Sequence, residues 1–282
     1  MVKTPKSSFH KKVKLNIFAR LVPTFLVLIF FSLSCSLLQS QEPSAEDYFN
    51  QGNQYYGQEQ YAQAIDSYTK AIQLDPKFAS AYGNRGLVYS DQKQYDLAVV
   101  DLNKAIELDP TLVPVYNSRG TVYMDQEKYD LAIADFTQAI QLDPENAMLY
   151  RNRGRSYNDQ KKYALAIADH TKAIQLEPQN ANSYYDRGVV YFEQNQFDLA
   201  IADFAKTLQL SPQYAPAYTN RETIYAQQKQ YEQAIDDFTR AIQINPQDYL
   251  AYQNRGLVYQ IIGKQKEADA DFQKYKELTG AP

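Results

Sequence analysis

A proline recurs every 34 residues along most of the chain. Its positions are 76, 110, 144, 178, 212 and 246. Nearly the same residues precede each one, as in Ala-Ile-Gln-Leu-Asp-Pro at 71–76 and Ala-Ile-Glu-Leu-Asp-Pro at 105–110. A fixed period of this length indicates stacked copies of one small unit rather than a globule with a single core. The period therefore constrains the fold class and directs the question of function toward the surface.

Two helices are predicted within each unit, as residues 79–112 illustrate. The first covers about 80–90 and the second about 95–108, and each carries one apolar stripe that must be buried against a partner. The residues between them are enough only for a tight antiparallel turn. Asp109-Pro110 ends the second helix, because a proline disfavours helix in the residue before it. Pro114 and Pro216 instead fall in the first turn of a helix, where the missing N–H is not needed.

The units resemble the tetratricopeptide repeat (TPR) family, whose pattern has a large residue, glycine, tyrosine, alanine, an aromatic, alanine and proline at fixed places. In 79–112 these places hold Tyr82, Gly86, Tyr89, Ala98, Leu102, Ala105 and Pro110. In 113–146 they hold Tyr116, Gly120, Tyr123, Ala132, Phe136, Ala139 and Pro144. Counting by 34 gives seven units: 45–78, 79–112, 113–146, 147–180, 181–214, 215–248 and 249–282. The resemblance implies an all-α, right-handed α-solenoid whose first helices line a concave groove for extended peptides or a partner's helix.

Three residues depart from the pattern, and one of them, Thr207, is a small residue in place of the interface alanine of the fifth unit. Glu222 replaces the glycine of the sixth unit, so we expect that helix pair to be splayed or the carboxylate to turn outward. His170 replaces the aromatic residue of the fourth unit. We interpret it as a core histidine hydrogen-bonded to a neighbour rather than as a metal ligand or a catalytic group.

Charged residues recur with the same period. Six units carry an arginine just before the glycine place: Arg85, Arg119, Arg153, Arg187, Arg221 and Arg255. The same six carry an aspartate sixteen residues later: Asp101, Asp135, Asp169, Asp203, Asp237 and Asp271. The first unit has neither, with Gln51 and Ser67 at these places. The joint presence predicts an ion pair between the two helices of one unit. Separately solvated charges, or an anion site built by the arginines, are the alternatives.

The start of the chain lies outside the repeats. Residues 1–20 hold six basic residues and no acidic one, and 21–38 are apolar apart from scattered serines and Thr24. A basic start followed by an apolar run is the layout of an export signal, and the length also allows a membrane anchor. We therefore assign 1–40 to a signal peptide or N-terminal membrane anchor and 41–44 to a linker. Either form would place the repeats across the membrane, on a periplasmic or other extracytoplasmic face.

Cys35 ends that apolar run and is the only cysteine of the chain. Ser32-Leu33-Ser34-Cys35 resembles the lipobox of bacterial lipoproteins, in which the cysteine becomes the acylated first residue, although Ser32 stands where leucine is usual. Cys35 is thus a lipidation candidate. Three forms stay open: a lipoprotein, a cleaved soluble protein and an uncleaved anchor.

The last unit differs from the others on its outer face. A terminal repeat has no neighbour, so its outer face should turn polar. Asp269 and Lys276 stand in the seventh unit where Ile133 and Ile140 stand in the third. We interpret 264–278 as a C-terminal cap and expect the array to end there with no further domain.

Composition narrows the classes of partner and of activity. Residues 21–282 hold 23 of the 29 basic residues and all 33 acidic ones, a formal charge of −10. An acidic surface argues against nucleic acid, which requires a basic footprint. No phosphate loop, paired cysteines, metal-binding His-Glu-His cluster or nucleophile–base pair is found in the sequence. We therefore predict a protein that is not an enzyme, with no catalytic residue, metal or cofactor.

The repeat register also predicts the side chains of the groove. Late in the first helix stands an acidic column: Asp91, Asp125, Asp159 and Glu193. Earlier in the helix stands a mixed cluster: Asn117, Arg151, Arg155 and Tyr185. Asn84, Asn152, Asn220 and Asn254 add amides able to hold a peptide backbone. If the column faces the groove, its ligand should be a basic or polar peptide. The alternative is that the column only closes the turn as a solvated helix end.

These inferences favour an interaction protein. The first interpretation is a membrane-tethered scaffold outside the cytoplasm that binds protein or peptide partners, similar in plan to bacterial TPR lipoproteins. The second is a soluble exported binding module or a chaperone-like carrier of peptide segments. The sequence does not indicate the partner, the pathway or the oligomeric state.

Overall fold

The computed structural model describes residues 42–280. The predicted signal or anchor at 1–40, with Cys35, lies outside the described residues. Within 42–280 the chain forms fourteen α-helices and no strand, so the all-α prediction is confirmed. None of these helices combines the length and apolar character needed to cross a membrane.

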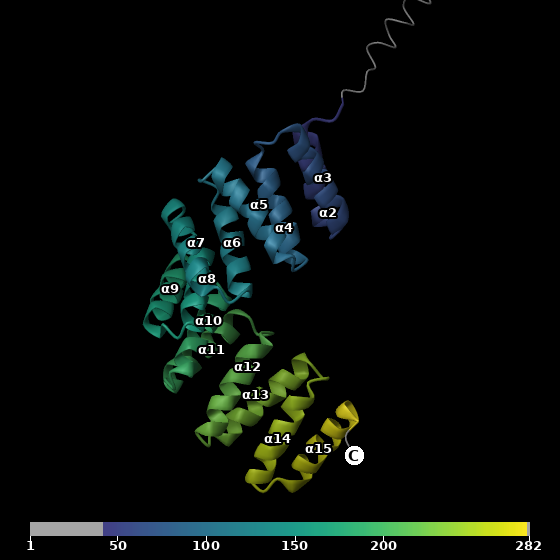
Figure 1. Cartoon of the computed structure of the whole chain (residues 1–282). Helices are drawn as coiled ribbons and strands as arrows, with labels where there is room; N and C mark the ends of the chain where they lie inside the picture. The colour runs from purple at the N-terminus through teal and green to yellow at the C-terminus, as the bar shows by residue number, and fades with distance from the viewer. Residues whose placement is uncertain (1–41, 281–282) are drawn as a thin grey trace, which may run out of the picture. The chain divides into compact units, whose positions relative to one another are not determined.

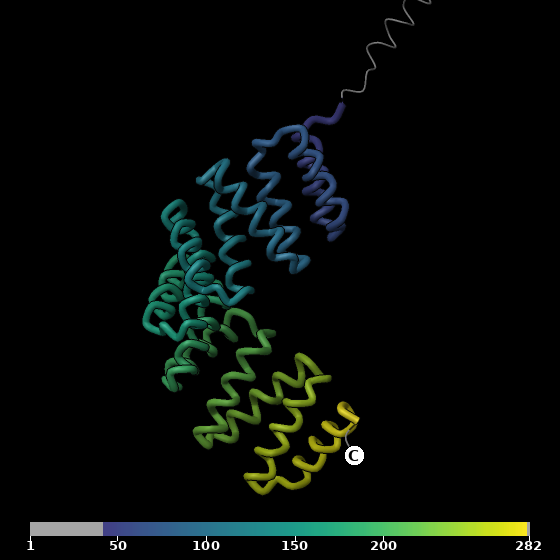
Figure 2. Tube along the Cα trace, viewed as in Figure 1, coloured from purple at the N-terminus to yellow at the C-terminus, as the bar shows by residue number. Residues whose placement is uncertain are grey.

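The helices form seven antiparallel pairs (Figures 1 and 2). The first helices are α2 (Ala45–Gly57), α4 (Ala79–Asp91), α6 (Val113–Asp125), α8 (Ala147–Asp159), α10 (Ala181–Glu193), α12 (Ala215–Gln227) and α14 (Tyr249–Ile261). The second helices are α3 (Tyr61–Leu74), α5 (Tyr95–Leu108), α7 (Tyr129–Leu142), α9 (Tyr163–Leu176), α11 (Phe197–Leu210), α13 (Tyr231–Ile244) and α15 (Gln265–Thr279).

Local sequence accounts for the ends of these helices. Asp109, the residue before Pro110, is extended at φ −143° and ends α5. Pro114 and Pro216 lie in the first turns of α6 and α12, as predicted. In the turn inside each pair, the second residue after the first helix is left-handed, as in Lys93 at φ 59° and Gly263 at φ 76°. Only at Gly263 is that position a glycine, the residue that adopts this conformation most readily.

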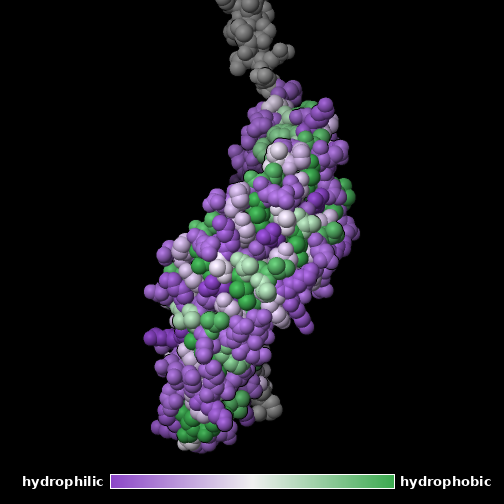
Figure 3. Space-filling view, turned by 90° about the vertical axis from the view of Figure 1, so that its left-hand side faces the viewer, coloured by the Kyte–Doolittle hydropathy of each residue, from purple (hydrophilic) through white to green (hydrophobic). Residues whose placement is uncertain are grey.

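Each helix packs against its pair partner, and each second helix from α3 to α13 also packs against the first helix of the next pair. Successive first helices, such as α8 and α10, also contact one another, so their side chains share one surface. Small residues allow the close approach inside a pair: a Cβ added to Gly120 would lie 2.7 Å from the ring of Phe136. Ala132 and Ala139 beside this ring are fully buried. The face in Figure 3 is mainly hydrophilic, with separate patches of hydrophobic residues.

All six predicted arginine–aspartate pairs are present as two-bonded ion pairs between the helices of one unit. In the third unit, Arg119 Nε and Nη2 donate to Asp135 at 2.8 and 2.6 Å. Each aspartate is buried, and each arginine lies over a tyrosine ring, as Arg119 does over Tyr116 and Tyr123. The hydrogen bond to Asp135 raises the pKa of Arg119, against the opposing effect of burial. The arginines therefore already hold a carboxylate and form no separate anion site.

Five of these arginines also reach the preceding unit. Their Nη1 donates to a side chain on the previous second helix, at Thr69, Asn103, Thr137, Thr171 and Thr239. The same place in the fifth unit holds Ala205, which has no side-chain acceptor for Arg221. Each of these five arginines thus links the two helices of its own unit and also links that unit to the one before it. Arg221 links only the two helices of the sixth unit.

The sixth unit also contradicts one expectation. Glu222 does not turn outward: it is 2 % exposed, and its Oε2 has no hydrogen-bond partner among the described residues. Burial, with the nearby charges of Asp237 and Asp248, raises the pKa of Glu222 to about 9. The side chain is therefore a neutral acid at pH 7, which is the form that tolerates burial. At the other end of the array, Asp269 and Lys276 are both exposed, as expected for the outer face of a last unit.

Candidate functional site

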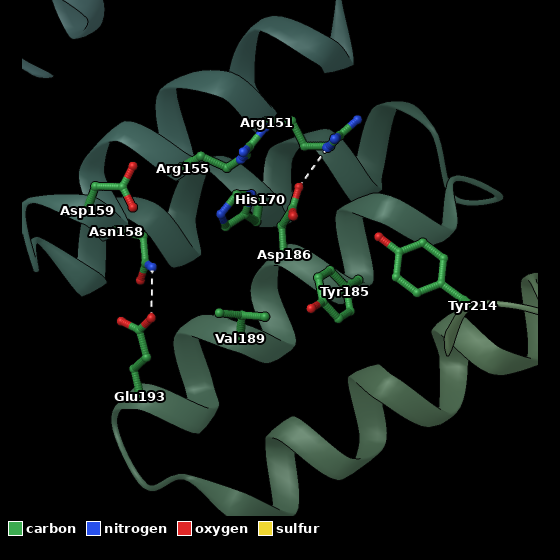
Figure 4. Close-up of a pocket in the computed structure, with 10 residues that line it drawn as sticks. All are labelled: Arg151, Arg155, Asn158, Asp159, His170, Tyr185, Asp186, Val189, Glu193 and Tyr214. Atoms are coloured by element: carbon green, nitrogen blue, oxygen red, sulfur yellow. Dashed lines mark hydrogen bonds and ion pairs between the residues drawn. The ribbon is translucent and has the colours of Figure 1, made fainter. Parts of the chain in front are cut away.

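A cavity of about 430 Å³ opens between the fourth and fifth units. Its volume is in the range of sites that hold a small ligand or one or two side chains. Helices α8, α9 and α10 and the residue before α12 supply its walls (Figure 4). The lining residues are Arg151, Arg155, Asn158, Asp159, His170, Tyr185, Asp186, Val189, Glu193 and Tyr214.

Helix periodicity explains why these side chains meet. On α8, Arg151, Arg155 and Asp159 are each four residues apart and so lie on one face of the helix. On α10, Tyr185, Val189 and Glu193 have the same spacing. Because α8 and α10 are adjacent first helices, the two faces border one hollow.

The middle of the cavity is positively charged at α8. Arg151 Nε donates to Asp186 Oδ2 at 2.7 Å, an ion pair between adjacent units. Arg155 makes no hydrogen bond or ion pair with any residue in the part of the chain that the structure describes. Its guanidinium therefore has all its donors available to a ligand.

One end of the cavity carries acceptors. Asn158 Nδ2 donates to Glu193 Oε1 at 3.2 Å, while Asn158 Oδ1 is buried and has no partner within 42–280. Burial raises the pKa of Asp159; Arg155 opposes this shift and Glu193 adds to it. Figure 4 shows Asn158, Asp159 and Glu193 gathered at this end. Two carboxylates that repel each other beside an unused acceptor favour a cation there.

The opposite end is aromatic. The rings of Tyr185 and Tyr214 lie 4.9 Å apart between centroids, and Tyr185 also packs on Phe204 at 5.8 Å. Asn220 Nδ2 donates to the Tyr185 hydroxyl at 3.2 Å, which ties α10 to α12. Burial raises the pKa of both tyrosines, so they remain neutral at pH 7. This end offers flat apolar surface and hydroxyl groups.

His170 forms part of the wall from α9. It is 1 % exposed, as expected for a core residue, but the expected hydrogen bond to a neighbour is wrong: neither ring nitrogen has a partner in the described residues. Burial lowers its pKa to about 4, and Asp186 and Asp169 oppose that shift. The imidazole is therefore neutral at pH 7. Other units hold a larger or purely apolar side chain here, such as Phe136, Phe204 or Leu102.

Comparison with known proteins agrees with the repeat register. The family model described as "TPR repeat" matches residues 52–93, 154–195 and 223–263. Those described as "Tetratricopeptide repeat" match 79–112, 113–146 and 181–214, and also 249–281. The chain belongs to the tetratricopeptide repeat family. No curated protein matches its sequence.

Solved structures are similar to parts of this TPR array. YrrB, described as "a TPR protein with an unusual peptide-binding site", is 27% identical, with a TM-score of 0.54 over 67% of this chain and 97% of its own. MamA is 28% identical, with a TM-score of 0.53 over 56% of this chain and 93% of its own. The C-terminal part of a TPR protein from Cytophaga hutchinsonii is 21% identical, with a TM-score of 0.67 over 83% and 96%. The last of these shows likeness of fold alone.

Five predicted groove residues line the TPR cavity: Arg151, Arg155, Asp159, Tyr185 and Glu193. The others do not line it. Asn84 donates to Asn53 at 2.8 Å, and Asn152 donates to Asn117 at 2.9 Å, so these amides bind one another between units. Asp91 accepts from the Tyr56 hydroxyl at 2.7 Å, and Asp125 is exposed. The acidic column thus ends the first helices, and only its last two members also enter the cavity.

Sequence reasoning missed Asn158, Asp186, Val189 and Tyr214, and it assigned His170 only to the core. One signal could have found Asp186. No other unit has an acid at this place: the third has Ser118, and the others have Asn50, Asn84, Asn152, Asn220 and Asn254. No comparable signal marks Tyr214, because its position depends on how the fifth unit meets the sixth.

Proposed function

We propose that this TPR protein is a non-catalytic scaffold that captures an extended peptide segment of a partner protein at the cavity between α8 and α10. The observation that carries the proposal is the convergence of Arg155, Asp159 and Glu193 on one open cavity, where none of the three forms an ion pair with a described residue. A peptide can supply matching charges and lay its backbone along the groove. The described peptide-binding site of YrrB, a TPR relative, supports the same class of ligand.

We further propose that the array works outside the cytoplasm and is tethered to a membrane through residues 1–40. The support is the basic start, the apolar run and Cys35 in the sequence. Mass spectrometry of the mature N-terminus separates the three forms. An acylated Cys35 indicates a lipoprotein, a later N-terminus indicates a soluble exported module, and an intact Met1 indicates an anchor. A protein found wholly in the cytosolic fraction would contradict the proposal.

A matched pair of substitutions tests the peptide site. Asp159 and Asp125 hold the same place in adjacent units, but only Asp159 lines the cavity. The full chain and its Asp159→Lys and Asp125→Lys forms are used to capture partners from envelope extracts, which are identified by mass spectrometry. We expect Asp159→Lys to lose a defined partner that Asp125→Lys retains. Equal capture by all three forms would exclude the cavity as the binding site.

A further inference from the structure

The cavity holds two charge poles at a fixed spacing. The acidic pole is Asn158, Asp159 and Glu193, and the basic pole is Arg155, with Arg151 behind it. Arg155 and Asp159 are one helical turn apart on α8, so the poles are separated by about 6 Å along the helix. In an extended peptide, side chains two residues apart point the same way and are separated by about 7 Å. The spacing of the poles therefore matches that of alternate residues of a strand.

The acidic pole requires a positive group from outside. Burial raises the pKa of Asp159, Arg155 opposes that shift and Glu193 adds to it. Among the described residues, no Lys or Arg forms an ion pair with Asp159 or Glu193. Asn158 Oδ1 is buried without a partner, which is costly unless a donor reaches it. A lysine or arginine side chain brings several donors on one charged head and satisfies all three residues together.

The basic pole requires the opposite charge. Asp186 already engages Arg151 Nε, whereas Arg155 has no bonded partner within 42–280. A carboxylate two residues from the basic side chain of the ligand would reach Arg155 and the free Nη groups of Arg151. Between the poles, the neutral ring of His170 adds no net charge that would favour either sign.

We infer that the cavity selects an extended partner segment in which a basic and an acidic side chain stand two residues apart. The inference rests on the proposed function, because it specifies the peptide that the groove captures. The basic side chain lies against Asn158, Asp159 and Glu193, and the acidic one lies against Arg155. The aromatic end, Tyr185 and Tyr214, covers the residue that follows the acidic one.

Selection from a fully randomised nine-residue peptide library, displayed on phage, tests this inference with the full chain as bait. We expect enrichment of sequences with a basic and an acidic residue two positions apart in one consistent order. A synthetic peptide of the selected sequence should bind Asp159→Asn about tenfold more weakly, since one charge-assisted contact is lost. It should bind Asp125→Asn unchanged.

Two variants make the test specific. Exchanging the poles by Arg155→Glu together with Asp159→Lys and Glu193→Lys should reverse the order of the two charges in the selected peptides. His170→Phe should keep the fold, since Phe136 and Phe204 occupy the same place in neighbouring units, and should weaken binding because the larger ring fills part of the cavity. Circular dichroism of both variants checks that the helices are intact.

The outcomes separate this inference from the proposed function. Peptides that lack the charged pair but bind the original chain and not Asp159→Lys would overturn the inference and leave peptide capture standing. An unchanged selection by the exchanged variant would also overturn it. Failure to enrich any peptide over an unrelated bait would overturn both.

Discussion

The third and the sixth TPR units share the same backbone but differ in what their two helices hold between them. In the third, Gly120 lets the helices meet over Phe136, and Arg119 ties Asp135 to Asn103 of the unit before. In the sixth, a buried neutral Glu222 replaces the glycine, and Arg221 reaches only Asp237. Because repeats contact only their neighbours, an array tolerates a weakened unit if the flanking units are regular. The cavity lies beside that weakened junction, since Tyr214 comes from it.

The largest difference between the third and sixth units should appear when the aspartate of the arginine–aspartate pair is neutralised in each. Asp135→Asn leaves Arg119 buried without its partner and should lower the free energy of unfolding by about 3–5 kcal/mol. Asp237→Asn should cost clearly less. Burial raises the pKa of Asp237, so keeping this carboxylate charged in the folded state costs free energy. Its charge also contributes to the raised pKa of Glu222. Urea unfolding followed by circular dichroism, with hydrogen exchange to resolve single units, measures both.

Asp96→Asn is the control for that pair, because Asp96 is exposed and should leave the midpoint nearly unchanged. Equal losses for Asp135→Asn and Asp237→Asn would mean that the two units are equally dependent on the pair. The arginine–aspartate pair would then stabilise the third and sixth units by the same amount.

The ionisation of Glu222 should make the sixth unit sensitive to alkali. Its folded pKa of about 9 lies above the ordinary 4.5, so the folded state keeps a proton that the unfolded state releases. The contribution is complete below pH 4.5 and is lost as pH rises toward 9. Between pH 5 and pH 7 the free energy of unfolding should fall by about 2.5 kcal/mol through this group. Glu222→Gln should remove that part of the slope in urea titrations at each pH.

The reciprocal change in the third unit checks the cause. Gly120→Glu would drive a Cβ to 2.7 Å from Phe136 and should destabilise the unit at every pH. A stability profile of Glu222→Gln that ran parallel to that of the original chain from pH 5 to pH 7 would contradict the raised pKa.

His170 should make the fourth unit sensitive to acid instead. Its folded pKa of about 4 lies below the ordinary 6.5, so the unfolded state binds a proton first as pH falls. The stability is complete above pH 6.5, and about 2 kcal/mol of it should be lost between pH 6 and pH 4. His170→Phe, which copies the third and fifth units, should lack that loss. If both proteins lost the same stability over this range, His170 would not be the group that titrates.

The regular parts of this protein were predictable and its exceptions were not. The proline period and the glycine, alanine and aromatic places predicted the helix pairs, because local backbone rules and packing act alike in each unit. The arginine–aspartate pairs were predictable because six units carry both residues and the first unit carries neither. Burial of Glu222 and the lack of partners for His170 did not follow, since each depends on whether neighbouring side chains leave an acceptor or donor within reach. For the same reason, the register could not separate Asp159, which lines the cavity, from Asp125, which does not.

The smallest expected effect concerns the hydrogen bond that links the arginine of one unit to the second helix of the unit before it. Thr137 Oγ1 accepts from Arg153 Nη1 at 3.1 Å, whereas Ala205 offers Arg221 no acceptor. Thr137→Val keeps the branched shape and should cost about 1 kcal/mol by removing that bond. At the weak junction, Ala205→Thr should be more stable than Ala205→Val by a similar amount, because the two differ only in the hydroxyl that Arg221 can reach. Hydrogen exchange of α11 and α12 should slow in Ala205→Thr alone. If Ala205→Thr and Ala205→Val were equally stable, the missing hydroxyl would not be what distinguishes this junction.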